Sequence, residues 1–95
     1  MLIASTRIVT KLKQKHNVTL DEVEECISNL DPSYKLLTDI REGNTTIPPT
    51  LWFVSETNSG RILKVVVIID ENNDIHLKTA YKANPTEIMI YNNNR

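Results

Sequence analysis

Cysteine is almost absent from the sequence, because Cys26 is the single one among 95 residues. One thiol cannot form an internal disulfide framework or a cysteine-rich zinc site. Glycine is also scarce, with two residues beside four prolines, which argues against a long flexible linker. The longest apolar run, residues 65–69, is far shorter than the about 20 residues that cross a bilayer. We therefore expect a soluble chain with no membrane partner.

Neither sign of charge dominates the composition. Eleven Lys and Arg residues against twelve Asp and Glu residues give a formal net charge of -1, which argues against binding nucleic acid through bulk charge alone. The apolar residues 1–4 are followed by Ser5, Thr6 and Arg7, which break the stretch before a signal-peptide core forms. Together with the lone cysteine, this predicts a cytoplasmic location. The length predicts a single domain over residues 1–95.

Two helices are predicted ahead of any strand. Ser5 is placed to cap the first, which runs toward Lys15 with apolar residues at helical spacing. Thr19 and Glu22 have the spacing of a capping box for the second, which ends at residues 31–32. Cys26 falls on the apolar stripe of this second helix, so we interpret it as a core residue.

Four strands are predicted at residues 34–39, 51–57, 62–70 and 75–81, with an irregular loop at 40–49. The strand at 62–70 is apolar on both faces and is expected at the centre of the sheet. Asn84 and Pro85 begin a short helix that should end near Tyr91, before a frayed tail at 92–95. This order predicts an α+β fold with two N-terminal helices, a four-stranded mainly antiparallel sheet, a short C-terminal helix, and helices mainly on one side.

The register of the hairpins predicts which side chains share a face. A turn at residues 72–73 gives three pairs, Ile68 with Leu77, Val66 with Thr79, and Lys64 with Tyr81. If Gly60 is the left-handed residue of a three-residue loop, the residues Trp52, Val54 and Glu56 join the face of Lys64. A two-residue turn would move them to the other face. On the favoured register, the remaining face packs against the helices and carries Leu51, Phe53, Leu63, Val65, Val67 and Ile69.

Several segments resemble the BrnT toxins. Gly60 and Arg61, the apolar strand after them, residues 75–81, and then Glu87 and Tyr91 follow the spacing of that family. Residues 16–19, followed by an acidic helix, are similar to the family's opening His-Gly-Val-Ser/Thr segment. The resemblance covers roughly residues 16–91 and depends on spacing and on several polar positions.

The resemblance implies a small RelE-like fold, a ribonuclease activity that arrests translation, and an antitoxin that neutralises it. Neither a metal nor a cofactor is expected. Arg61 matches the arginine of the family's Gly-Arg pair, and Glu87 and Tyr91 match its C-terminal glutamate and tyrosine. His76 falls where an arginine is usual.

One departure from the family concerns its Ser-Ala-Arg segment, which reads Thr79, Ala80, Tyr81 in this chain. The basic group has in effect moved to Lys78 or Lys82. A lysine does not reproduce the bidentate grip of an arginine on phosphate, so this position decides whether the chain is catalytic.

Ribonuclease chemistry without a metal needs a base for the 2'-hydroxyl, a group that stabilises charge on phosphorus, and a proton donor. The candidate catalytic residues are Arg61, Lys64, His76, Lys78, Tyr81 and Lys82, and the candidate substrate-binding residues are Trp52, Glu56, Glu87 and Tyr91.

Each candidate also has a structural interpretation. Lys78 and Lys82 can be charges that protect an edge strand, and His76 can be an exposed strand residue. Tyr81 and Trp52 can pack on the sheet, and Arg61 can form a salt bridge with Glu56 across its hairpin. His16 is interpreted as a turn residue.

The sequence thus predicts a translation-linked ribonuclease toxin, with RNA, in solution or on the ribosome, as substrate. An antitoxin is expected to cover the sheet face, and assembly is expected either as a homodimer or as a hetero-oligomer with that antitoxin. The alternative is a non-catalytic module that binds protein or nucleic acid on the same scaffold.

Overall fold

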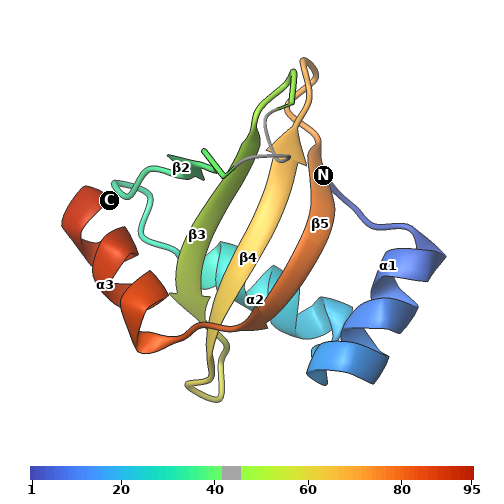
Figure 1. Ribbon diagram of the computed structural model, residues 1–95. Coiled ribbons are helices and arrows are strands. Elements are labelled where there is room, and N and C mark those ends of the chain that lie inside the picture. The colour runs from blue at the N-terminus through green and yellow to red at the C-terminus, as the bar shows by residue number, and fades with distance from the viewer. Residues whose placement is uncertain (42–45) are drawn as a thin grey trace.

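The computed structural model describes residues 1–41 and 46–95, and it has the predicted α+β class. Figure 1 shows helices around one curved sheet. The elements in chain order are β1 (Leu2–Ile3), α1 (Thr6–Lys11), the π-helix η1 (Leu12–His16), α2 (Leu20–Asn29), β2 (Leu37–Thr38), β3 (Thr50–Glu56), β4 (Ile62–Ile69), β5 (Ile75–Lys82) and α3 (Pro85–Asn94). The loop predicted at 40–49 lies partly outside the described residues.

The two N-terminal helices begin where the sequence predicts. Ser5 caps α1, because its Oγ accepts a hydrogen bond from the Ile8 amide at 3.2 Å. The helix continues as η1 and ends at Asn17, whose φ of 51° is left-handed. At the start of α2 both bonds of the capping box are present between Thr19 and Glu22.

The sheet has one strand more than predicted. Its order is β1-β5-β4-β3-β2, so β4 is central as expected. β1 pairs in parallel with β5, and the sheet is therefore five-stranded and mixed, which corrects the prediction of four strands. The amide of Ile75 donates to the carbonyl of Met1 at 2.8 Å. A strand of two residues is too short for an alternating pattern to reveal it.

The turn between β3 and β4 has the predicted form. Gly60 has a φ of 87°, and the amide of Thr57 donates to the carbonyl of Arg61 at 2.8 Å across a three-residue loop. Trp52 lies opposite Val66 and Val54 lies opposite Lys64. The prediction that β3 presents Trp52, Val54 and Glu56 on the face of Lys64 is confirmed.

The turn between β4 and β5 differs from the prediction. Asp70 and Asp74 close a three-residue loop in which Asn73 has a φ of 64°. Ile68 therefore pairs with His76, and the predicted pair with Leu77 is wrong. A bulge at Lys78 then shifts the register by one residue, so Val66 pairs with Thr79 and Lys64 with Tyr81 as predicted.

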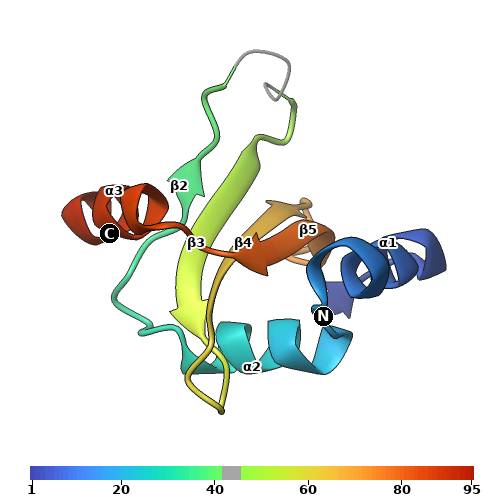
Figure 2. The ribbon, with the colours of Figure 1, turned by 60° about the horizontal axis from the view of Figure 1, so that its bottom comes forward.

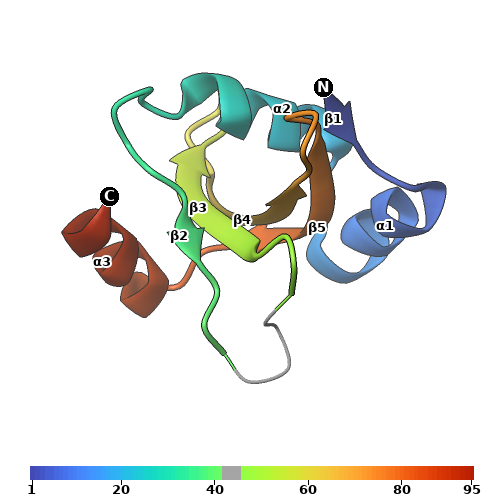
Figure 3. The same ribbon diagram turned by 90° about the horizontal axis from the view of Figure 1, so that it is seen from above.

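Helices cover the sheet from more than one side, which corrects the prediction of helices mainly on one side. Figure 2 shows α2 beneath the sheet, with α1 and α3 beside its two edges, and Figure 3 shows the same curved sheet from above. Phe53, on the face away from Trp52, lines a hollow with Ile27 of α2. Tyr91 of α3 packs on Trp52 instead, with ring centres 5.8 Å apart.

The last helix is longer than predicted, because α3 continues through Asn94 and the expected frayed tail is wrong. The Asn94 side-chain amide donates to the Ile90 carbonyl at 2.7 Å. The Arg95 guanidinium lies 4.0 Å from the centre of the Tyr34 ring, which holds the end of the helix near the loop before β2.

Candidate functional site

Lys64 lies at the centre of a group of polar contacts on the outer face of the sheet, which is the face that also carries Trp52. Its side chain is only 7% exposed, and its Nζ lies 3.0 Å from Oε2 of Glu87. The same ammonium lies 4.6 Å from the centre of the Trp52 ring and 5.8 Å from that of Tyr81. We call these four residues, Lys64, Glu87, Trp52 and Tyr81, the Lys64 site.

Glu87 uses its two carboxylate oxygens for different contacts. Oε1 accepts a hydrogen bond from the Asn84 amide at 3.0 Å and completes the capping box of α3. Oε2 accepts the Tyr81 hydroxyl at 3.0 Å and contacts Lys64. Burial raises the pKa of Glu87, but the hydrogen bonds from Asn84, Lys64 and Tyr81 outweigh it and hold the pKa below its ordinary value. The carboxylate is therefore ionised at neutral pH.

A groove of about 550 Å³ opens beside the Lys64 site and is lined by Lys64, Trp52 and Glu87. Arg41 and Asp39 also line the groove, and they form a bidentate ion pair. Nε of Arg41 donates to Oδ1 of Asp39 at 3.1 Å, and Nη2 donates to Oδ2 at 2.8 Å. The bonds from Arg41 lower the pKa of Asp39. The Arg41 side chain is 60% exposed, so it places a cation at the groove that sequence analysis missed. No motif marks an arginine in an irregular loop.

His16 is a second residue whose place the sequence did not reveal. It ends η1, and its ring centre lies 5.5 Å from that of Tyr81 with the planes tilted by 39°. Both side chains are partly exposed. The residue interpreted from the sequence as a turn residue is thus a neighbour of the Lys64 site, although 64 residues separate it from Tyr81 in the sequence.

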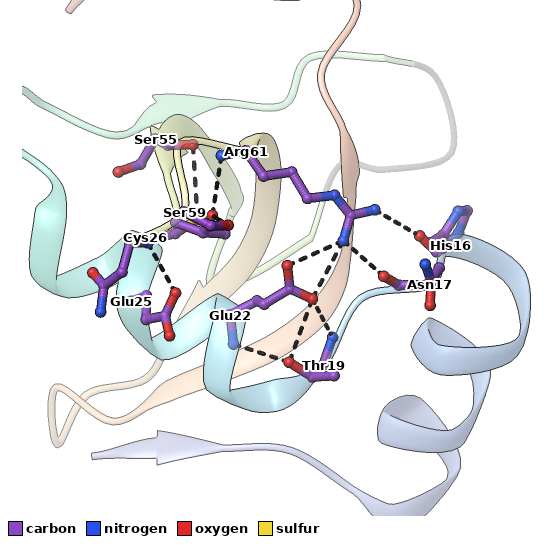
Figure 4. A network of polar contacts seen from close by, with 11 residues as sticks. His16, Asn17, Thr19, Glu22, Glu25, Cys26, Ser55, Ser59 and Arg61 are labelled. Atoms are coloured by element: carbon purple, nitrogen blue, oxygen red, sulfur yellow. Dashed lines mark hydrogen bonds and ion pairs between the residues drawn. The ribbon is translucent and has the colours of Figure 1, made fainter.

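Arg61 lies outside the Lys64 site and joins η1 to α2 (Figure 4). Its Nη1 donates to the carbonyl of Asn17 at 2.7 Å and contacts Glu22 Oε2 at 3.1 Å. Its Nη2 donates to the carbonyl of His16 at 3.2 Å. The carboxylate partner is therefore Glu22 and not the Glu56 that the hairpin suggested, and the guanidinium satisfies carbonyls at the end of η1.

The other predicted catalytic residues are spread along β5. His76 lies near the start of β5, where it pairs with Ile68 close to the turn after β4. Its Nε2 lies 2.8 Å from Asp70 Oδ2. Lys78 is exposed at the bulge, and Lys82 is exposed where β5 ends. Of the six candidates, the fold joins Lys64 and Tyr81 directly.

The predicted substrate-binding residues also separate. Trp52 and Tyr91 are buried against each other, and the Tyr91 hydroxyl donates to the Lys35 carbonyl at 3.0 Å. Glu56 is exposed and lines a different, larger hollow of about 810 Å³. That hollow lies between α2, β3 and α3 and excludes Lys64, so we place the candidate site at the smaller groove. Two of the four, Trp52 and Glu87, contact Lys64, Trp52 through its ring and Glu87 through its carboxylate.

Within residues 1–41 and 46–95, no three His, Cys, Asp or Glu side chains are grouped as a metal ion would require. None of the helices in these ranges is both long and apolar enough to cross a membrane.

Comparison with known families and proteins gives no further assignment. No protein-family model matches the chain, and no curated protein matches it. The resemblance to the BrnT toxins therefore stays a prediction.

Proposed function

We propose that this chain is the toxin of a toxin-antitoxin module, with a RelE-like fold of the BrnT type, and that it cleaves RNA in the cytoplasm without a metal. One observation carries the proposal. Lys64, Tyr81 and Glu87, predicted as functional from three separate segments, meet within hydrogen-bond distance beside an open groove.

The chemistry of these groups suits a phosphodiester. The ammonium of Lys64 supplies a fixed positive charge for the phosphorus oxygens, and Arg41 supplies donors at the groove. The Tyr81 hydroxyl can turn from Glu87 toward a leaving oxygen and protonate it. Glu87 holds both side chains in place.

The groove also supports the proposal of an antitoxin. Ile40 is 87% exposed and Ile90 is 41% exposed, and both line the groove next to the Arg41 and Lys64 cations. An antitoxin segment with apolar and acidic side chains would bury the isoleucines and compete with RNA for the cations.

Induced expression in a bacterium tests the proposal. Growth arrest and fragmented cellular RNA are expected for the wild-type chain, and Tyr81→Phe should relieve both. Lys35→Ala, which changes an exposed side chain outside the groove, serves as the control. Normal growth with intact RNA at equal protein levels would overturn the assignment.

A non-catalytic binding module is the second candidate. It is favoured by the pairing of Lys64 with Glu87, which neutralises the central cation, and by the use of Arg61 in the η1–α2 contact. Purified protein separates the two candidates. A labelled RNA that is retained on the protein but stays intact over hours supports the binding module, whereas its cleavage in the presence of EDTA supports the ribonuclease.

A further inference from the structure

We propose that His16 is the base that deprotonates the RNA 2'-hydroxyl, and that Arg61 is the positioning residue that holds His16 at the Lys64 site. The inference rests on the proposed ribonuclease function. The reaction needs a proton acceptor, and the Lys64 site does not supply one. Glu87 is a poor proton acceptor because its pKa is lowered and its carboxylate is already bound by three donors.

The first support is the location of the His16 ring. Its centre lies 5.5 Å from the Tyr81 ring centre, and the Lys64 ammonium lies 5.8 Å from that same centre. The Tyr81 phenol thus has both an imidazole and an ammonium within 5.8 Å of its ring centre, and the imidazole and the phenol are partly exposed. No hydrogen bond to the ring nitrogens of His16 occurs among the described residues, so the ring is available to a substrate. His76, the other histidine, is instead engaged by Asp70 at 2.8 Å.

The second support is the way the chain fixes this position (Figure 4). Arg61 binds the backbone carbonyls of His16 and Asn17 and leaves the imidazole untouched. Glu22 holds the guanidinium from the other side and is itself bound to Thr19 in the capping box of α2. The segment that carries His16 is therefore bound both to the turn that precedes β4 and, through Glu22, to α2.

The proposed step is a transesterification at phosphorus. The 2'-oxygen loses its proton to His16 and forms a bond to phosphorus, while the bond from phosphorus to the 5'-oxygen breaks. The Tyr81 hydroxyl gives its proton to that 5'-oxygen. The products are a 2',3'-cyclic phosphate and a 5'-hydroxyl, and proton exchange through water restores His16 and Tyr81.

The test uses the purified full chain and a short RNA with one cleavable phosphodiester. His16→Ala should lower kcat by about 100-fold or more and leave KM within about threefold, because a lost general base affects chemistry and not binding. Added free imidazole should raise the activity of His16→Ala by at least about tenfold. A variant that is inactive because of a packing defect would not respond to imidazole. Gln14→Ala, an exposed change on the same π-helix, is the control.

Arg61 is tested by a double-mutant cycle. Arg61→Lys should lower kcat in the wild-type chain but have no further effect once His16 is alanine, since it acts through His16. Equal effects of Arg61→Lys in both backgrounds would overturn the positioning role. Thermal unfolding of each variant, with His16→Gln as a second substitution, verifies that activity is compared between folded proteins.

The outcomes separate this inference from the proposed function. A wild-type chain that cleaves no RNA overturns both. A wild-type chain that cleaves RNA, with His16→Ala and His16→Gln equally active, overturns the role of His16 and leaves the ribonuclease in place.

Discussion

The Lys64 ammonium and the Glu87 carboxylate are 3.0 Å apart, and their ion pair joins the central strand of the sheet to the first turn of α3. Their side chains are 7% and 16% exposed, so both charges have lost much of their water. The pair tolerates this because Tyr81 and the Asn84 amide also donate to the carboxylate. It therefore fixes where α3 begins on the outer face of the sheet.

Removing both members of the pair should destabilise the protein by less than the sum of the two single losses. Lys64→Met leaves a partly buried carboxylate without its cation, and we expect it to lower the free energy of unfolding by roughly 3 kcal/mol. Glu87→Gln keeps the capping box but leaves the ammonium unpaired. The double variant should recover at least about 1 kcal/mol of the summed loss. Urea unfolding followed by the fluorescence of Trp52 measures all three, and strictly additive losses would contradict this.

Stability should fall in acid partly through Glu87. Its pKa is lower in the folded chain than the about 4.3 of an unfolded glutamate, so its ionised form favours folding. That contribution is complete above the unfolded pKa and disappears as the pH falls through the folded one. Glu87→Gln should therefore show a shallower decline of unfolding free energy below about pH 4.5. Glu24→Gln, an exposed change on α2, is the control, and parallel curves for wild type and Glu87→Gln would refute this role.

Local signals predicted the helices and most of the sheet. Ser5, Thr19 and Asn84 each begin a helix because their side chains bind an amide three residues on, and that contact needs no distant partner. The pairing of Leu2 with Ile75 joins residues far apart in sequence and could not be inferred from either segment. The register of β5 was predicted correctly at Lys64 and Tyr81 because the turn and the bulge shift it in opposite directions.

The candidate site was predictable only in part for the same reason. Tyr81 and Lys64 face each other through hairpin pairing, which a turn reveals. Arg61 follows a turn glycine, but its partners belong to η1 and α2, which depend on how the helices pack on the sheet. His16 reaches Tyr81 through that same packing.

Deleting Lys78 should leave the fold and the Lys64 site intact. Lys78 is the extra residue of the bulge, so its removal joins Leu77 to Thr79 in a regular ladder with all other pairs preserved. We expect the free energy of unfolding to stay within about 1 kcal/mol of the wild-type value. Deleting Ala80 instead reverses the faces of the residues that follow and should abolish cooperative unfolding. A Lys78 deletion that unfolds like the Ala80 deletion would contradict this register.

Cys26 should resist thiol reagents in the folded protein. Its side chain is fully buried, and its Sγ lies 3.7 Å from the carbonyl of Ser55. Burial, with the Glu22 and Glu25 carboxylates adding to it, raises the pKa of the thiol to about 12, so the reactive thiolate is almost absent at neutral pH.

Labelling with a chromogenic disulfide at pH 8 measures this protection. The folded chain should react only as fast as it opens, whereas the chain in guanidinium should react at once and to one thiol per molecule. Because the thiol reacts only after the fold opens, Lys64→Met should increase the labelling rate. If global unfolding exposes the thiol, the increase should equal about the factor by which the substitution raises the equilibrium constant for unfolding. Labelling of the wild-type chain at the rate of a free thiol would place Cys26 outside the core between α2 and β3.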